Sequence, residues 1–353
     1  MFDLQKLLRE NIKNLQPYSS ARDEFKGNAE IYLDANENAF GSPGGENYNR
    51  YPDSFQLELK KKIGSIKGLL PDCLFTGNGS DEVIDLLFRA FCRPGTDNVI
   101  ICPPTYGMYE VSANINDVFV KKAPLTASFE PDLDLIAELI DENTKLLFLC
   151  SPNNPTGNSV RREDVEMILN NFNGIVVIDE AYINYSRQRS FISELTEYPN
   201  LVVLQTLSKA WGLAGIRVGM AFASPEIIEV LTKIKPPYNL SETSQQIAVH
   251  ALDKLDQVNE WIRITVQERE KLAKALAVFS FVQKVYPSDA NFLLVKMDDP
   301  KGIYDALVAK GIIVRDRSKI SLCEGCLRIT VGKPAENEKL VEALGNWQLL
   351  PKN

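Results

Sequence analysis

The sequence predicts an α/β fold, with a large domain whose mostly parallel central sheet is flanked by helices and a smaller α+β domain built from the N-terminal arm and the C-terminal part. Between about residues 72 and 223, short apolar runs alternate with amphipathic segments, which is the pattern of buried parallel strands covered by helices. After Pro236-Pro237 long charged helices and further strands follow. We expect residues 1–40 to form the arm and part of the small domain, 41–240 the large domain and 241–353 the small C-terminal domain.

The individual elements follow from the spacing of apolar residues. Val83, Leu87 and Phe91 fall on one helical face, so a helix begins near Val83, and another covers 135–140. A helical stretch is expected from Ser241 to about Ala277. The predicted strands are Val99 to Cys102, Lys145 to Cys150, Ile175 to Asp179, Leu201 to Gln205 and Val218 to Ala223 in the large domain, and 291–296, 312–315 and 327–331 in the small one.

Composition excludes several classes of protein. Hydrophobic residues make up 44% and charged residues 24% of the chain, and no apolar run approaches the roughly 18 residues of a membrane helix. The formal charge of −8 argues against a nucleic-acid partner. The first residues lack the pattern of a secretory signal, so we expect a cytoplasmic protein without a membrane partner.

The six cysteines are scattered and predict reduced thiols. Cys323 and Cys326 form the only Cys-x-x-Cys pair, which suits metal or redox work in other proteins. A structural zinc site needs about four ligands, and the sequence offers no second pair or histidine cluster. We therefore expect no metal and interpret the pair as structural.

Lys209 has surroundings that no other lysine of the chain shares. It follows the apolar run Leu201–Leu204, is flanked by small residues and Ser208, and has Arg217 eight positions later. Such a lysine can form a Schiff base with a carbonyl group. The single histidine, His250, lies in a helical stretch, which disfavours a mechanism with histidine as general acid or base. We therefore expect the lysine to transfer the proton that such a reaction moves.

Asp179 ends the predicted strand Ile175 to Asp179, where an unpaired charge would be costly. A protonated ring nitrogen on a cofactor would be a suitable partner, and the carboxylate would keep that nitrogen protonated. Capping of the next element is the alternative role, because aspartate is also a favoured helix N-cap. For Asp179 alone the two roles are equally good, and Lys209 favours the first.

Gly79, Ser80 and Asp81 precede the predicted helix at Val83 and resemble a cradle for an anion. The glycine lets the backbone approach a ligand, and free N–H groups at a helix start point toward it. A glycine turn with Ser80 as N-cap is compatible with that role. Ser208 and Arg217 could hold the same phosphate through a hydroxyl and a guanidinium.

Two further turns follow predicted strands. Asn154 lies in Ser151-Pro152-Asn153-Asn154-Pro155, where the prolines fix its position, and its amide can donate to a ring oxygen. Tyr106 follows Pro103-Pro104 and could stack on a flat ring. Either segment alone is a common turn.

In this order, these segments resemble the pyridoxal-phosphate enzymes of the aspartate-aminotransferase fold, fold type I, and among them the histidinol-phosphate aminotransferases. The resemblance covers most of the chain. Its further segments are Pro17-Tyr18-Ser19-Ser20-Ala21-Arg22, Leu33-Asp34-Ala35-Asn36-Glu37-Asn38, Asn49-Arg50-Tyr51-Pro52, Gly311-Ile312-Ile313-Val314-Arg315 and Cys326-Leu327-Arg328-Ile329-Thr330-Val331-Gly332.

The resemblance implies a role for each matching residue. Lys209 would hold pyridoxal 5′-phosphate covalently, Asp179 would pair with the ring nitrogen, and Tyr182, as a third catalytic residue, would join Asn154 at the phenolic oxygen. Tyr106 would stack on the ring. The remaining cofactor contacts would come from Gly79, Ser80, Asp81, Ser208 and Arg217, and from Tyr51 of a second subunit, which makes the protein a homodimer with shared active sites.

The resemblance also implies the substrate contacts, Tyr18, Asn36, Arg315 and Arg328. One pocket must accept glutamate or 2-oxoglutarate and a phosphate ester in turn, and guanidinium binds both carboxylate and phosphate bidentately. By position alone, Arg315 and Arg328 suit ordinary salt bridges at strand edges, and Tyr51 suits packing in a turn.

The activity implied is reversible amino transfer between histidinol phosphate and 2-oxoglutarate, giving imidazole-acetol phosphate and glutamate, in histidine biosynthesis. An aromatic-amino-acid aminotransferase and a threonine-phosphate decarboxylase on the same fold are the alternatives. A non-catalytic regulator that senses pyridoxal phosphate is a rival from another class, but the first seventy residues contain no basic recognition helix.

Overall fold

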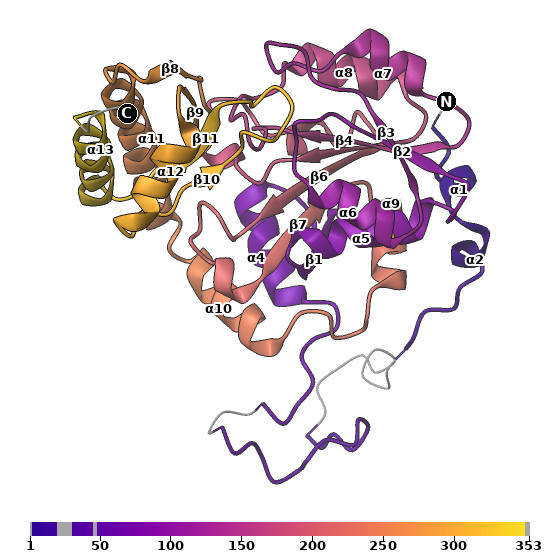
Figure 1. Ribbon diagram of the computed structural model, residues 1–353. Helices are drawn as coiled ribbons and strands as arrows, with labels where there is room; N and C mark the ends of the chain where they lie inside the picture. Colours follow the sequence, from indigo (N-terminus) through magenta and orange to yellow (C-terminus); the bar gives the residue numbers. More distant parts are fainter. Residues whose placement is uncertain (1, 20–29, 45–47, 350–353) are drawn as a thin grey trace.

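The computed structural model describes residues 2–19, 30–44 and 48–349 and contains two sheets, each with its own helices (Figure 1). The large sheet occupies the middle of the molecule, and the small sheet lies with the orange and yellow C-terminal helices. The predicted fold class, a mostly parallel sheet flanked by helices together with a smaller α+β unit, is confirmed. The division of the chain at residues 40 and 240 stays a prediction.

The large sheet has seven strands, and six of them run in one direction. Only β7 is antiparallel to its neighbours, β1 and β6. In spatial order the strands are β1 (Leu74–Asn78), β7 (Val218–Phe222), β6 (Leu201–Thr206), β5 (Ile175–Asp179), β4 (Thr144–Cys150), β2 (Asn98–Ile101) and β3 (Phe119–Lys122). The five predicted strands are present. The sequence missed β1, which ends in polar residues, and β3, an edge strand with two lysines.

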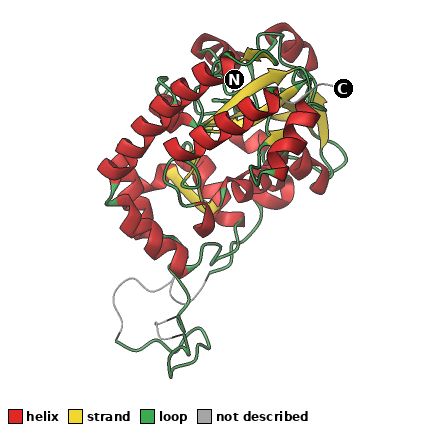
Figure 2. Cartoon of the chain, turned by 60° about the vertical axis from the view of Figure 1, so that its left-hand side comes forward, coloured by secondary structure: helices red, strands yellow, loops and turns green. Residues whose placement is uncertain are grey.

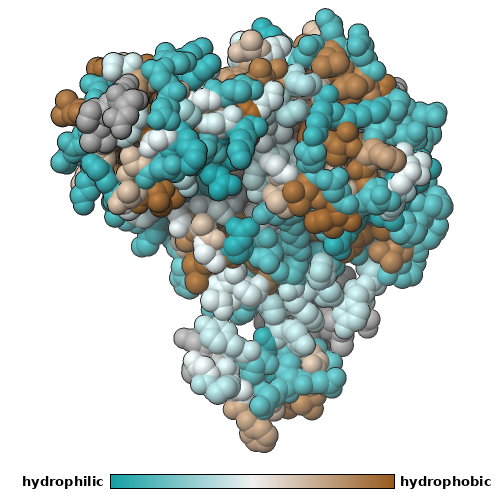
Figure 3. Space-filling model, in the orientation of Figure 1, coloured by the Kyte–Doolittle hydropathy of each residue, from teal (hydrophilic) through white to brown (hydrophobic). Residues whose placement is uncertain are grey.

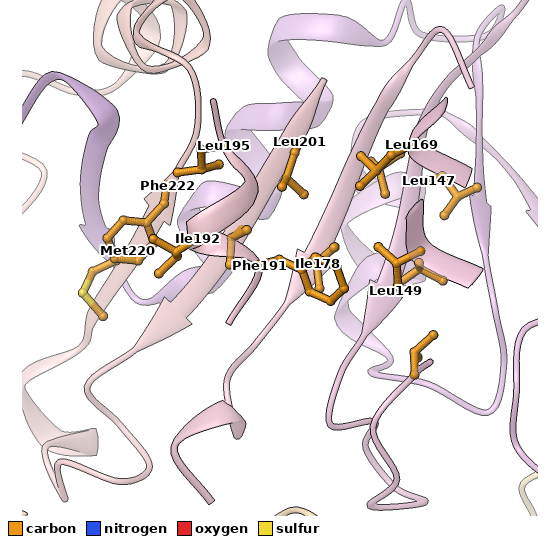
Figure 4. Close-up of a cluster of buried hydrophobic side chains, with 14 of the residues drawn as sticks. Leu147, Leu149, Leu169, Ile178, Phe191, Ile192, Leu195, Leu201, Met220 and Phe222 are labelled. Carbon is orange, nitrogen blue, oxygen red and sulfur yellow. The ribbon is translucent and has the colours of Figure 1, made fainter. Parts of the chain in front are cut away.

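Alternate residues of the central strands pack on opposite faces of the sheet. Leu147 and Leu149 of β4 join one hydrophobic core, and Leu146 and Phe148 join the other. Figure 4 shows the first core, where side chains of several strands meet Phe191 and its neighbours. Because both faces are buried, the strands are apolar throughout instead of alternating.

Helices cover both faces of this sheet. The face of Leu146 is covered by α5 (Ser80–Phe91), α6 (Met108–Ile115) and α9 (Pro225–Ile234); the other is covered by α4 (Leu57–Lys67), α7 (Leu133–Leu139), α8 (Arg162–Asn171) and α10 (Glu242–Leu252). Short 3₁₀ turns are η1 (Pro71–Cys73), η2 (Ile183–Tyr185), η3 (Phe191–Glu194) and η4 (Ala214–Ile216).

The smaller sheet is antiparallel and has its own core. Its strands, in spatial order, are β10 (Arg315–Asp316), β11 (Cys326–Thr330), β9 (Phe292–Met297) and β8 (Val282–Val285), and its helices are α11 (Leu255–Ala277), α12 (Pro300–Ala309) and α13 (Pro334–Gln348). The helical stretch expected over 241–277 is two helices: α10 packs on α4, whereas α11 packs on β8 and α13. β8 was not predicted, and β10 is only two residues long.

The N-terminal segment packs in another place than expected. We predicted that residues 1–40 contribute to the small domain, but α1 (Leu4–Leu7) and α2 (Glu10–Lys13) lie against the large unit. Leu8 and Ile12 join the core beneath α5, and Arg9 Nη1 donates to the carbonyl of Arg89 at 2.9 Å. The apolar side chains of this segment pack into the core of the large unit. Their spacing in the sequence did not indicate which of the two cores they would join.

Residues 30–44 and 48–51 belong to a long loop that projects downward from the body of the molecule in both views (Figures 1 and 2). In the described parts of the chain, no helix is long and apolar enough to cross a membrane.

The topology brings the ends of all seven strands to one edge of the large sheet. The carboxyl ends of β1 to β6 lie there, because these six strands run in one direction. The antiparallel β7 begins at the same edge, so the residue before it, Arg217, joins residues that follow the other strands. Ligands of open α/β sheets bind at this edge.

Candidate active site

A cavity of about 120 Å³ lies at this edge of the sheet. Its lining contains nine of the residues predicted for the site: Ser80, Asp81, Tyr106, Asn154, Asp179, Tyr182, Ser208, Lys209 and Arg217. A hollow of about 930 Å³ elsewhere is larger, but none of these nine residues lines it. The convergence of polar side chains from separate strands marks the smaller cavity as the candidate active site.

Lys209 follows β6 in a tight turn. The N–H of Gly212 donates to the carbonyl of Lys209 at 3.1 Å, and the N–H of Ser208 donates to Thr206 Oγ1 at 3.0 Å. Its Nζ lies 5.7 Å from the centre of the Tyr182 ring. Partial removal from water lowers the pKa of Lys209 from its usual value, and the charges of Arg328 and Arg217 lower it further against the opposing effect of Asp179. A neutral amine can therefore form more easily than on the surface.

Asp179 is buried at the end of β5 and accepts two hydrogen bonds. Tyr109 Oη donates to one carboxylate oxygen at 2.8 Å, and the N–H of Ala181 donates to the other at 3.0 Å. Burial raises the pKa of Asp179, whereas these two donors and the charge of Lys209 lower it. Among the described residues no cation lies within ion-pair distance of Asp179, so a cationic partner would have to come from a ligand.

The turn predicted to bind an anion lies at the start of α5. Gly79 has φ of +81° and precedes the helix, so it occupies the N-cap position that the sequence had offered to Ser80. A Cβ on Gly79 would lie 2.5 Å from Arg217 Nη2, and one on Gly219 would collide with the backbone N of Ser80. Gly79 needs glycine because of its positive φ, and Gly219 needs glycine because the backbone of Gly79 and Ser80 lies against it.

Asp81 connects the cradle to its surroundings. Its carboxylate accepts a hydrogen bond from Tyr106 Oη at 3.0 Å and forms an ion pair with Arg217 Nη2 at 3.2 Å. Tyr106 packs edge-on against Tyr109. Arg217 and Tyr106 are thus oriented toward the cavity by the same carboxylate.

Asn154 is held by the smaller sheet. Arg328 Nη1 donates to Asn154 Oδ1 at 2.5 Å. A guanidinium can only donate, so the amide oxygen must face it, and the amide nitrogen remains to donate into the cavity. The donation from Asn154 to a ring oxygen stays a prediction.

Not every predicted residue lies at this cavity. Tyr18 lines the hollow of about 930 Å³, and Asn36 and Tyr51 line another of about 510 Å³. Tyr51 stacks on Tyr238 with ring centres 4.5 Å apart. A single chain therefore does not bring these three residues to Lys209, and their roles stay predictions. Arg315 lies opposite Arg328 in the β10–β11 pair.

The structure adds residues that the sequence did not suggest. Tyr109 is fully buried, stacks on Phe148 and holds Asp179, but its place in an amphipathic helix resembles that of any core aromatic. Thr206, at the end of β6, lines the cavity, and its hydroxyl donates a hydrogen bond to Ser208 Oγ. Its position at a strand end was the signal that could have revealed it.

Two motifs outside the cavity fit a structural role. His250 Nδ1 lies 2.8 Å from the carbonyl of Gln246 within α10. Burial raises the pKa of the Cys323 thiol to about 12 and that of Cys326 to about 11, as expected for inert thiols. In the described parts of the chain, no cluster of three or more metal-binding side chains occurs.

Comparison with known proteins supplies the family. The family model for aminotransferase class I and II matches residues 33–344. A histidinol-phosphate aminotransferase of Parabacteroides distasonis is 53% identical over 99% of this chain and 100% of its own length. The structure resembles that of histidinol-phosphate aminotransferase from Sinorhizobium meliloti in complex with pyridoxal-5′-phosphate, with a TM-score of 0.80, 25% identity, and 89% of each chain covered.

The fold alone is shared more widely. L-Threonine-O-3-phosphate decarboxylase from Porphyromonas gingivalis matches with a TM-score of 0.73 and 22% identity, over 85% of this chain and 91% of that one. The cavity, the family match over most of the chain and the identity above one half to a full-length relative agree: this chain belongs to the class I and II aminotransferases, in the group of the histidinol-phosphate aminotransferases.

Proposed function

We infer that the chain is a pyridoxal-phosphate-dependent histidinol-phosphate aminotransferase, which moves an amino group between histidinol phosphate and 2-oxoglutarate. The observation that carries this inference is the convergence of Lys209, Asp179, Asn154 and Arg217 in one cavity of a chain that is 53% identical to such an enzyme. The chain has a net negative charge, so individual basic residues at the site, and not a broad basic surface, would bind these anionic substrates.

The donor set of the cavity fits the cofactor. Asp179 has no ion-pair partner among the described residues and would hold the protonated ring nitrogen. The amide nitrogen of Asn154 and the hydroxyl of Tyr182 would bind the phenolic oxygen. Gly79 and Gly219 lie in close contact at the start of α5. The backbone N–H groups of this helix start would bind the phosphate of the cofactor together with Ser208 and Arg217. When bound, the cofactor supplies an electron sink for the carbon that loses its proton.

Lys209 would move the proton in this reaction. Because its pKa is lowered, the amine would be able to accept the proton from the substrate Cα and to deliver it to the C4′ carbon of the cofactor. Asp179 would stay ionised opposite the ring nitrogen, held by Tyr109 and the N–H of Ala181. Lys209 therefore needs no histidine as a partner.

Arg315 and Arg328 are proposed to orient the substrate. They occupy paired positions on neighbouring strands, and Arg328 reaches Asn154 at the rim of the cavity. The resulting guanidinium pair would bind the distal carboxylate of glutamate and the phosphate of histidinol phosphate in turn.

A homodimer is proposed because the N-terminal loop exposes apolar side chains. Ile31 is 74% exposed, Leu33 87% and Phe40 100%. Figure 3 shows hydrophobic residues at the tip of this projecting segment. Such exposure suits contact with a second copy, which would bring Tyr51 to the partner's cofactor. Tyr18 and Asn36 would reach the substrate through the same assembly. Cytoplasmic location is proposed from the biosynthetic role.

The activity is tested with the purified holoenzyme, histidinol phosphate and 2-oxoglutarate. We expect glutamate formation with ping-pong kinetics and faster turnover than with phenylalanine or tyrosine as donor. Equal or faster aromatic turnover would instead indicate an aromatic aminotransferase. Carbon dioxide release from threonine phosphate without a keto acid would indicate the decarboxylase.

Shared active sites are tested by mixing two variants. Lys209→Ala and Tyr51→Ala homodimers should each be weakly active or inactive. After subunit exchange, a mixed dimer has one site with both defects and one site with neither, so activity should return. Mixtures that remain inactive, although mixed dimers form, would place Tyr51 outside the partner's site.

A further inference from the structure

A third arginine, Arg317, lies beside the two that the resemblance assigned to the substrate. It follows Arg315 by two positions, so both side chains leave the same side of the extended segment. Its N–H donates to the carbonyl of Cys326 at 2.9 Å, which continues the pairing of β10 with β11. Because Arg328 lies directly opposite Arg315, the three guanidinium groups belong to one face of the small sheet.

That face is the one directed at the active-site cavity. Arg328 donates to Asn154 there, and its guanidinium lies 5.2 Å from the centre of the Phe292 ring. The phenol of Tyr182, which lines the cavity, is within electrostatic range of both Arg317 and Arg328. Arg317 is therefore close to the reacting groups although the cavity itself ends before it.

The three arginines have no acidic partner in the part of the chain that the structure describes. The side chains with the largest electrostatic effect on Arg317 are Arg328, Arg315, Cys323 and Tyr182, and no carboxylate is among these. Removal from water, together with the two neighbouring arginines, lowers the pKa of Arg317. Like charges held together without a counter-ion are costly, and a bound anion would relieve that cost.

Two buried donors are also left without a hydrogen bond. Nε of Arg317 and Nε of Arg328 are both inaccessible to solvent and lack an acceptor among the described residues. Buried polar groups are satisfied in the great majority of cases, so each exception needs an explanation. A ligand that carries several acceptor oxygens would satisfy both.

The two substrates of the proposed reaction differ in their demand for donors. A carboxylate offers two oxygens and one negative charge, for which two guanidinium groups suffice. A phosphate monoester offers three terminal oxygens and nearly two charges. We propose that Arg317 supplies the third guanidinium to the phosphate of the substrate, and so favours the phosphate ester over the dicarboxylate. This inference rests on the proposed function.

The test compares three variants of the holoenzyme. Arg317→Gln removes the charge and the donor fork, Arg317→Lys keeps the charge without the fork, and Lys319→Gln removes a cation from an exposed side chain of the same turn. KM and kcat are measured for the histidinol phosphate and glutamate half-reactions, and thermal unfolding checks that each variant is folded.

Arg317→Gln should raise KM for histidinol phosphate about 10- to 100-fold, as expected for the loss of hydrogen bonds to a charged group, with little change in kcat. The glutamate half-reaction should change much less. Arg317→Lys should lie between the wild type and Arg317→Gln, and Lys319→Gln should match the wild type. An equal rise in both half-reactions, or no rise in either, would overturn the role of Arg317.

Inorganic phosphate separates this inference from the proposed function. It should inhibit the glutamate half-reaction of the wild type competitively, and Arg317→Gln should weaken that inhibition. A wild type without histidinol phosphate turnover would refute the proposed function, while weaker phosphate inhibition in Arg317→Gln would still support the anion site. Normal turnover with unchanged phosphate inhibition in Arg317→Gln would refute the role of Arg317 alone.

Discussion

The two sides of the active site differ in how completely their polar groups are satisfied. On the large sheet, Asp179 accepts two hydrogen bonds, and Asp81 holds Arg217 and Tyr106 together. On the small sheet, Nε of Arg317 and of Arg328 are buried without acceptors among the described residues. The carboxylates of the first side have hydrogen-bond donors within the chain, whereas the two buried donors of the second side would be satisfied by a bound anion.

This difference matches the residence time of the molecule that each side would hold. A cofactor that stays bound needs preorganised groups, and the large sheet fixes them at strand ends within a packed core. Substrates bind and leave in every catalytic cycle, so the arginines proposed to bind them must be able to accept each new anion. An unsatisfied buried donor costs about 1–3 kcal/mol, and the small sheet retains two of them. Substitutions on the two sides test this contrast, and their expected effects decrease from Lys209 to Tyr109.

The largest effect is expected from Lys209→Ala. The variant loses both the covalent attachment and the group that moves the proton, so turnover should fall by about 10⁴-fold or more. The visible absorbance of the bound cofactor should also change. Steady-state assays and absorbance spectra measure both effects. Lys67→Ala, at a lysine outside the cavity, is the control, and substantial activity in Lys209→Ala would exclude its proposed role.

Asp179→Asn should lower turnover by about 100-fold or more, because the amide cannot hold a protonated ring nitrogen by charge. Its neighbour Glu180 provides a matched control. Glu180 is also a buried carboxylate and follows β5 directly, but it accepts hydrogen bonds from Ser190, the N–H of Phe191 and Gln205, away from the cavity lining. Glu180→Gln should lower the melting temperature and keep turnover per folded molecule. Equal losses of turnover would mean that Asp179 acts through stability.

Arg328→Gln tests the electrostatic link between the two sides. Arg328 is the charge that lowers the pKa of Lys209 most, so its removal should raise that pKa. Capture of pyridoxal phosphate by the apoenzyme needs the neutral amine, and its rate increases with pH. The rising limb should move to higher pH in the variant, by about one unit or less.

Arg315→Gln is the control for this pH dependence, since Arg315 is not among the charges with the largest effect on the pKa of Lys209. Its pH profile for cofactor capture should coincide with that of the wild type. If both variants shift the profile equally, the effect of Arg328 is a general one of net charge.

The smallest effect is expected from Tyr109→Phe. The variant removes one hydrogen bond to Asp179 but keeps the ring that stacks on Phe148. The pKa of Asp179 should rise, so the carboxyl remains protonated to higher pH, and the loss of turnover should be greatest at low pH and recover as pH increases. The free energy of unfolding should fall by about 1–3 kcal/mol.

Tyr304→Phe, on α12 of the small unit, is the control for Tyr109→Phe, because Tyr304 packs in the core of that unit. A pH–rate profile and a denaturant titration of both variants give the comparison. A loss in Tyr109→Phe that does not depend on pH would separate Tyr109 from the ionisation of Asp179.

Most of the satisfied side could be predicted from the sequence. Lys209, Asp179 and Asn154 each lie at or just after the end of an apolar strand, and parallel strands bring such residues to one edge of a sheet. Arg317 and Tyr109 could not be found in this way. Arg317 became a candidate only when its neighbours across the strand were known, and Tyr109 only when α6 was seen to pack behind Asp179.

The sequence by itself determined five of the seven strands of the large sheet, the turns after them and the chemical groups that those turns carry. These features depend on local periodicity and on residues close in the chain. The tertiary structure decided that β7 runs antiparallel and brings Arg217 to the cradle, that α1 and α2 pack on the large unit, and that three arginines share one face. Such arrangements depend on which distant surfaces bury each other, and no single segment encodes that choice.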